Sequence, residues 1–186
     1  MPSIISHAVV AVALKAAFPA PSVPRRLMFL GAACAVAPDI DVIGFGFGIE
    51  YGDLLGHRGL SHSLAFAVFL ALIGCFGAFP RPALPVRRGL VFLYLFLATA
   101  SHGLLDALTD GGMGVAFFAP FHNARYFFPV APISVSPIGL TSFISTRGLH
   151  VILSELLWVW VPSAIFAVAV ITSRRLSPGM HQLGRD

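Results

Sequence analysis

The sequence predicts an all-α, polytopic membrane protein with about five membrane-embedded helices. Of its 186 residues, 57% are hydrophobic and only 11% are charged, whereas soluble globular domains carry about 25% charged residues. A soluble protein with so few charges could not cover its surface. The run from Leu64 to Phe79 contains no charged residue at all. We expect residues 1–186 to form a single membrane-embedded domain.

The first two expected helices are short. One runs from Ile4 to Phe18, and the other from Leu27 to Ala37, where Pro38 and two aspartates follow. A helix that spans the bilayer core needs about 20 residues. The first helix is therefore tilted, shielded by its neighbours or partly re-entrant, and the second could be extended by its flanks. A glycine-rich loop, residues 44–56, separates them from the next apolar segment.

The last three expected helices are long enough to span. Ser61–Phe79 would reach roughly 28 Å at 1.5 Å per residue. Gly89–Leu108 follows a short basic loop, and His150–Thr172 is the fifth helix. Between the last two lies a long loop, residues 109–148, which is either a lid or a segment along the membrane surface. Cys34 and Cys75 lie in apolar runs without metal-binding spacing and read as small core residues.

The arginine and lysine residues predict the orientation in the membrane, because cytoplasmic loops carry an excess of them. Of the 12 such residues, one group falls on the side of the loop between the third and fourth helices: Lys15, Arg25, Arg26, Arg81, Arg87, Arg88, Arg174, Arg175 and Arg185. Only Arg58, Arg125 and Arg147 fall on the other side. We expect an outside N-terminus, a cytoplasmic C-terminus and a multi-pass chain.

With this topology, polar residues from separate helices meet at the outer face. The set consists of His7, Asp39, Asp41, His57, His62, His102, Asp106 and Asp110. Ionisable side chains in a membrane helix cost free energy unless they have a partner or a function. The convergence therefore predicts a polar site at one end of the helices.

The residue types favour a divalent metal ion. His102 and Asp106 are four residues apart, so they share one helical face. Imidazoles with carboxylates suit zinc, or manganese or iron where oxygen ligands dominate, and there are enough ligands for one or two ions. The candidate metal ligands are His7, Asp39, Asp41, His57, His62, His102 and Asp106. Three alternatives stay open: a hydrogen-bonded His102–Asp106 pair, solvated aspartates after Pro38, and a packed His7.

Further residues are candidates for catalysis and for substrate binding. The candidate catalytic residues are Asp41, His62 and Glu155, of which Glu155 could instead support the metal ligands or pair with Arg147 or another helix. Arg58 and Arg125 could clamp a phosphate, since an arginine fork suits it. Their alternative role is pairing with Glu50, Asp53 or Asp110.

These motifs resemble the YdjM-like family of inner-membrane, metal-dependent hydrolases. The resemblance covers about Ile4–Arg125 and rests on His7, Pro38-Asp39-Ile40-Asp41, residues 57–63 (HRGLSHS), His102 to Asp106 with Thr109, and Pro120-Phe121 with Arg125. It implies an inner (cytoplasmic) membrane location and hydrolase activity. The family is remotely similar to soluble zinc-dependent phospholipases C. Here, however, only one HxxxD pair is present, and no N-terminal tryptophan ligand, so one or two ions are expected rather than three.

The sequence thus favours a metal-dependent hydrolase, with water activated by the metal ion. The substrate would be a phosphoester in a membrane lipid or a lipid-linked molecule at the outer face. No nucleic-acid-binding module is present, and no feature sets the oligomeric state. Two alternatives remain: a non-catalytic protein that binds, senses or transports a metal ion, and a structural cluster of polar residues without chemistry.

Overall fold

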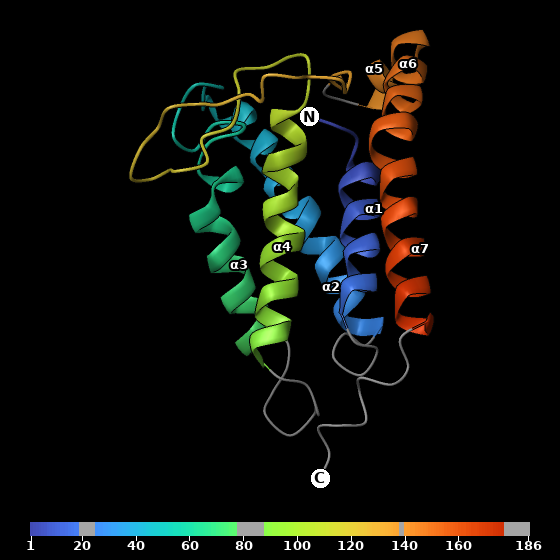
Figure 1. Ribbon diagram of the computed structural model, residues 1–186. Helices are drawn as coiled ribbons and strands as arrows, with labels where there is room; N and C mark the ends of the chain where they lie inside the picture. Colours follow the sequence, from blue (N-terminus) through green and yellow to red (C-terminus); the bar gives the residue numbers. More distant parts are fainter. Residues whose placement is uncertain (19–24, 78–87, 138–139, 177–186) are drawn as a thin grey trace.

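The protein is a helical bundle (Figure 1). The computed structural model describes residues 1–18, 25–77, 88–137 and 140–176. Among these, no β-strand is longer than the isolated bridges Thr109–Ile133 and Val115–Tyr126. The predicted all-α class is confirmed. Three helical stretches are long and apolar enough to cross a membrane, namely Arg26–Phe47, Arg88–Ala107 and Thr146–Leu176, and two shorter apolar helices cover Ile4–Ala17 and Leu64–Gly77.

The first predicted helix corresponds to α1 (Ile4–Leu14), which is extended by a 3₁₀ turn, Lys15–Ala17. The third and fourth correspond to α3 (Leu64–Gly77) and α4 (Arg88–Ala107). The predicted end of the third helix, the basic loop after it and the C-terminal tail with Arg185 lie partly or wholly outside the described residues.

The second predicted helix is longer than expected. Helix α2 (Arg25–Val36) continues as a 3₁₀ helix, Ala37–Phe47, and ends at Gly48, whose φ of 78° is left-handed. Pro38 does not end the helical structure, because it lies in the first turn of the 3₁₀ segment, where a missing N–H is tolerated. The expected end of the helix before Pro38 is therefore wrong, and so is the alternative of a helix-ending turn: Asp39 and Asp41 both lie within the helical continuation.

The long loop after α4 is shorter than predicted, because helical structure resumes before residue 148. A short α5 (Leu140–Phe143) precedes α6 (Thr146–Glu155), whose N-cap Ser145 accepts a hydrogen bond from the Gly148 N–H. A π-helical turn, Leu156–Trp160, then joins α6 to α7 (Val161–Leu176). Pro162 follows this turn and has no backbone N–H to donate to the preceding turn. The missing hydrogen bond accounts for the π-helical geometry there.

Small residues bring the helices together. Helix α4 packs against α3, α2 and α1, and Ala11, Ala35 and Ala98 form a buried contact among α1, α2 and α4. A Cβ at Gly31 would lie 2.5 Å from the Tyr94 ring, so only glycine fits there. Membrane helices associate through such small residues because lipid provides no hydrophobic driving force between them.

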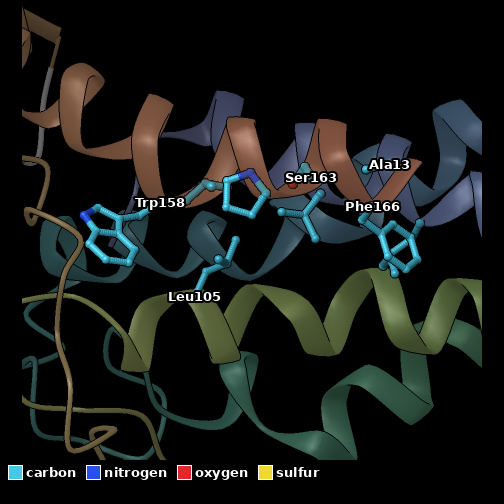
Figure 2. Close-up of a pocket in the computed structure, with 9 residues that line it drawn as sticks. Ala13, Leu105, Trp158, Ser163 and Phe166 are labelled. Carbon is cyan, nitrogen blue, oxygen red and sulfur yellow. The ribbon is translucent and has the colours of Figure 1, made fainter. Parts of the chain in front are cut away.

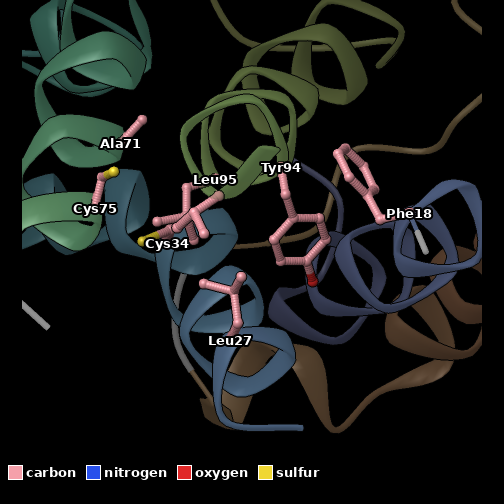
Figure 3. Close-up of a cluster of buried hydrophobic side chains, with 8 residues drawn as sticks. Phe18, Leu27, Cys34, Ala71, Cys75, Tyr94 and Leu95 are labelled. Atoms are coloured by element: carbon pink, nitrogen blue, oxygen red, sulfur yellow. The ribbon is translucent and has the colours of Figure 1, made fainter. Parts of the chain in front are cut away.

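The larger core cluster joins Phe18 to buried residues of α2, α3 and α4 (Figure 3). It contains Cys34 and Cys75 beside Leu95 and Tyr94, and both cysteines are free and buried. The prediction that they are small core residues is confirmed. The Tyr94 hydroxyl donates a hydrogen bond to the Ala11 carbonyl at 3.0 Å, which gives this buried polar atom a partner.

Helices α1 and α7 lie side by side and are joined at both ends (Figure 1). At one end, the fully buried Glu155 carboxylate accepts hydrogen bonds from the Ser3 backbone N–H, the Ser3 hydroxyl at 2.5 Å and the Ser6 hydroxyl at 2.6 Å. At the other end, the Arg174 guanidinium donates to the Phe18 carbonyl at 3.0 Å. A carboxylate at the N-terminus of α1 and a cation at its C-terminal end both complement the helix dipole.

The Glu155 contact predicts a loss of stability when the carboxylate is removed. Glu155→Ala leaves two buried hydroxyls and one N–H without their acceptor, and we expect thermal unfolding in detergent to show a loss of about 1–3 kcal/mol. Glu155→Gln keeps an acceptor oxygen and should lose less. Glu50→Ala, at an exposed position, is the matched control. Unfolding of Glu155→Ala at the wild-type temperature would contradict this role.

Candidate metal centre

Separate segments bring their polar residues to the end of the bundle that carries the loop after α4 (Figure 1). We call it the loop end. His7 lies in the first turns of α1, Asp39 in the continuation of α2, and His102 and Asp106 in the last turns of α4. His62 lies in a 3₁₀ turn, Leu60–His62, just before α3. The predicted convergence of these residues is confirmed, whereas the side of the membrane that they face stays a prediction.

The turn before α3 depends on glycine at two close approaches. A Cβ on Gly56 would lie 2.1 Å from the Glu50 carbonyl oxygen, and one on Gly59 would lie 2.3 Å from that of Leu54. Between them, Arg58 has a φ of 63°, an uncommon conformation for a residue with a side chain. Such backbone conformations persist where the surrounding structure holds them. Here the tight turn directs both His57 and Arg58 into the protein interior, where they are 2% and 0% exposed.

Four buried side chains form the first group: Asp39, His62, His102 and Asp106. Each offers one ligand atom, and these atoms all lie within 4.8 Å of one another. His102 Nε2 is 3.0 Å from His62 Nε2 and 3.3 Å from Asp39 Oδ1, and His62 Nε2 is 3.3 Å from Asp106 Oδ2. Ligands at 2.0–2.2 Å from a tetrahedral zinc ion lie roughly 3.3–3.5 Å apart. The other two imidazole–carboxylate distances are 3.7 and 4.0 Å, so the contacts bracket this spacing and the four side chains could hold one metal ion.

The partners of His102 fix which ring nitrogen faces this group. Its Nδ1 is 2.7 Å from the Ala35 carbonyl oxygen. Because a carbonyl can only accept, Nδ1 carries the proton and Nε2 keeps its lone pair in the neutral ring. Metal-binding histidines generally donate their second N–H in this way. The Ala35 carbonyl was not identifiable from the sequence, since a backbone acceptor leaves no signal in residue type.

Asp41, His57 and His62 form the second group. Asp41 Oδ1 is 2.7 Å from His57 Nδ1, and Asp41 Oδ2 is 3.2 Å from His62 Nδ1. The Ser61 hydroxyl donates to Asp41 Oδ2 at 2.5 Å. His62 thus belongs to both groups, with Nε2 in the first and Nδ1 in the second. Asp41 is placed to orient both imidazoles, as carboxylates do behind metal-binding histidines.

His7 lies against the first group. Its ring stacks on that of His102 with 3.7 Å between centroids, and its Nε2 is 3.7 Å from Asp106 Oδ1. Both ring nitrogens of His7 are buried without a hydrogen bond in the described part of the chain, and the Asp39 and Asp106 carboxylates contact only imidazoles and, for Asp106, the Arg58 guanidinium. Buried polar atoms of this kind cost free energy unless something pairs with them. A cation between these side chains would supply that partner.

The electrostatics of the two groups also favour a cation. Three carboxylates, those of Asp39, Asp41 and Asp106, surround His62. Burial disfavours the charged form of His62, but hydrogen bonds to these carboxylates outweigh it and raise the pKa of His62 to about 10. The negative charge of the carboxylates is therefore strong enough to hold a proton on a buried imidazole.

Both arginines, expected to bind phosphate, make contacts within the protein. Arg58 is fully buried, with Nε 3.0 Å from Asp106 Oδ2 and its two terminal nitrogens donating to the Gly111 carbonyl and the Thr109 hydroxyl. Arg125 donates to the carbonyls of His57, Tyr51 and Asp53. These contacts enclose Arg58, whereas Arg125 is partly exposed and uses three of its five N–H donors, so binding of a substrate by the arginines stays a prediction. Neither arginine forms an ion pair with Glu50, Asp53 or Asp110, although Arg125 contacts the Asp53 carbonyl.

Glu155 also lies apart from the two groups of candidate ligands. Its oxygens are occupied by Ser3 and Ser6, which the sequence analysis did not single out. Three donors hold this carboxylate at the N-terminus of α1, so it pairs with another helix, and the expected catalytic role stays a prediction. Asp110 accepts from the Val135 N–H at 2.7 Å, and His122 and His150 are exposed. His181 lies outside the described residues.

Comparison with known proteins agrees with the membrane fold and names a family. A family model described as YdjM inner membrane protein matches residues 1–177. The chain is 40% identical over 167 residues to inner membrane protein YbcI of Escherichia coli (strain K12), covering 89% of this chain and 94% of that protein. No solved structure matches, so the remote similarity to phospholipases C stays a prediction. The chain belongs to the YdjM family of inner membrane proteins.

Proposed function

We propose that this protein is a membrane-bound, metal-dependent hydrolase of phosphoester bonds in lipids or lipid-linked molecules. The observation that carries the proposal is the ligand set, two imidazoles and two carboxylates at metal-ligand spacing. Structural zinc sites are rich in cysteine, whereas catalytic sites use histidine with aspartate or glutamate. Both cysteines of this chain lie in the apolar core instead.

The residues of the first group would hold the ion: Asp39, His62, His102 and Asp106. Zinc fits two nitrogen and two oxygen ligands, and manganese or iron is the alternative. When bound, such an ion acts as a Lewis acid and lowers the pKa of a water molecule. The second group suits one further ion only if His62 bridges the two, so one ion is the simpler occupancy.

The remaining residues of the chain have supporting roles in this proposal. Asp41 holds His62 and His57 in orientation, and Arg58 fixes one oxygen of Asp106 while leaving the other toward His7. His7, whose two ring nitrogens are unpaired, is the side chain available as a fifth ligand or as a proton acceptor. A substrate in the membrane is proposed because the site lies at the end of apolar helices in an inner membrane protein.

A non-catalytic metal-binding or sensing protein is the second candidate. The observation that favours it is burial, since all four residues of the first group are buried. Structural sites are closed by four protein ligands, whereas catalytic sites keep one position open for water. The two candidates differ in one measurable property, which is turnover of a phosphoester by the metal-loaded protein.

Metal content tests the site itself. Protein purified in detergent without chelators should contain about one equivalent of zinc, manganese or iron by elemental mass spectrometry. His102→Ala should lose it because the variant removes one of the four ligands. His122→Ala is the matched control, since His122 is exposed and outside both groups. Equal metal content in all three proteins would refute the site.

Turnover distinguishes the two candidate functions. The metal-loaded protein should hydrolyse bis(p-nitrophenyl) phosphate or a phospholipid, lose this activity with a chelator and regain it when zinc or manganese is restored. His102→Ala should be inactive while still inserting into membranes. A metal-loaded protein that turns over neither substrate class would favour binding or sensing.

The role of Asp41 gives a graded prediction. Asp41→Asn keeps the shape of the side chain but weakens the hydrogen bonds to His57 and His62, and loss of such a supporting carboxylate lowers metal affinity roughly 10- to 100-fold. Competition with a fluorescent zinc chelator would measure this change. Asp110→Asn is the control, because Asp110 lies on the surface at the same end of the bundle. Complete loss of metal would instead make Asp41 a ligand.

A further inference from the structure

An apolar groove runs along the bundle between α4 and α7, with α1 as its floor (Figure 2). Its volume is about 260 Å³. Leu105 of α4 and Trp158 of the π-helical turn lie near one end, Ser163 lies midway, and Ala13 and Phe166 lie toward the other end (Figure 2). All these residues belong to helices that are long or apolar enough to lie in the membrane.

The groove begins next to the candidate metal centre. Leu105 lines it and directly precedes Asp106, whose side chain faces the metal ligands. On α1, Val10 lines the groove one helical turn after His7, about 4.5 Å further along the axis. The helices that supply Asp106 and His7 thus present apolar side chains directly beneath them.

The groove stays open because α7 packs on α1 rather than on α4. Helix α7 packs alongside α1 and its 3₁₀ turn, and no residue of α7 is buried. Glu155 and Arg174 fix this helix to α1 at both ends. The π-helical turn before Pro162 turns Trp158 outward, where it is 52% exposed, while the neighbouring Val159 is 2% exposed. The groove is therefore bounded by tethered helices.

We propose that this groove binds one hydrocarbon chain of a membrane lipid and places the lipid's polar head toward the metal centre. The inference rests on the proposed hydrolase function for the role of the head group, but the chain-binding site stands on the groove alone. An apolar hollow that opens sideways into a bilayer meets lipid chains and no other abundant ligand. Tryptophan favours the level of the lipid head groups, which fits Trp158 at the metal end of the groove.

A second groove of about 580 Å³ lies on the other side of α1 and is lined by Met28, Trp160 and Ile171 among others. It contains no residue of α4 and so does not adjoin Asp106 or His102. Its volume is larger, yet it has no continuity with the metal ligands. The two grooves therefore provide an internal comparison on the same helix, because Val10 lines the first and Val12 the second.

The test is photolabelling by a phospholipid that carries a diazirine in one acyl chain. The full-length protein is reconstituted in phosphatidylethanolamine vesicles with this probe, and labelled residues are mapped by mass spectrometry. We expect labelling concentrated on Leu105, Trp158 and Phe166, which line the first groove and not the second. Val10→Phe fills the first groove and should abolish that concentration, whereas Val12→Phe should keep it. Metal content equal to the wild type shows that both variants are folded.

Labelling spread evenly over exposed apolar side chains, or unchanged in Val10→Phe, would overturn the chain-binding site. This result does not depend on activity, since labelling needs neither metal nor turnover. Groove labelling in a protein that hydrolyses no phosphoester would refute the proposed function and leave the chain-binding site standing. Hydrolysis of bis(p-nitrophenyl) phosphate without groove labelling would do the reverse.

Discussion

The buried carboxylates of Asp39 and Asp106 impose the main constraint on this structure. Both lie in helical segments that are apolar along most of their length, and no backbone N–H or hydroxyl in the described residues donates to their oxygens. A buried carboxylate without a partner is strongly disfavoured. The side chains around them are the imidazoles of His62 and His102 and, for Asp106, the Arg58 guanidinium. Arg58 offsets one of the negative charges, and the remainder calls for a metal ion or a proton on His62.

The residues of the site were largely predictable because their chemistry conflicts with their surroundings. His102 and Asp106 stand out in an apolar helix, and their four-residue spacing places them on one face. Alternation of the helices then brings His7, Asp39 and His62 to the same end. The length of the second helix was not predictable from Pro38. Proline breaks a helix when it lies in the interior, but it is compatible with the first turn of a new helical segment. The 3₁₀ continuation is what turns Asp39 toward α4 instead of leaving it in a loop.

The roles of the other charged residues were not predictable, because they depend on distances that sequence spacing does not give. Arg58 was expected to face a substrate, yet the left-handed turn between Gly56 and Gly59 directs it inward to Asp106. Glu155 was expected either near the metal or paired with Arg147 or another helix, and it meets Ser3 and Ser6, which are about 150 residues away in sequence. Serine has no pattern that reveals such a long-range contact. In both cases the sequence correctly predicted that a charged residue in an apolar chain has a specific partner, but it did not identify that partner.

The contact between Glu155 and α1 links the metal centre to the groove. Ser6 precedes His7, so the hydrogen bond that fixes Ser6 also fixes the start of the helix that carries His7 against His102. The same contact sets α7 along α1 and leaves the space beside α4 unfilled. A shift of α7 toward α4 would close the groove and would also pull Glu155 from Ser3 and Ser6. The position of His7 at the metal ligands and the open groove beneath it therefore depend on one buried carboxylate.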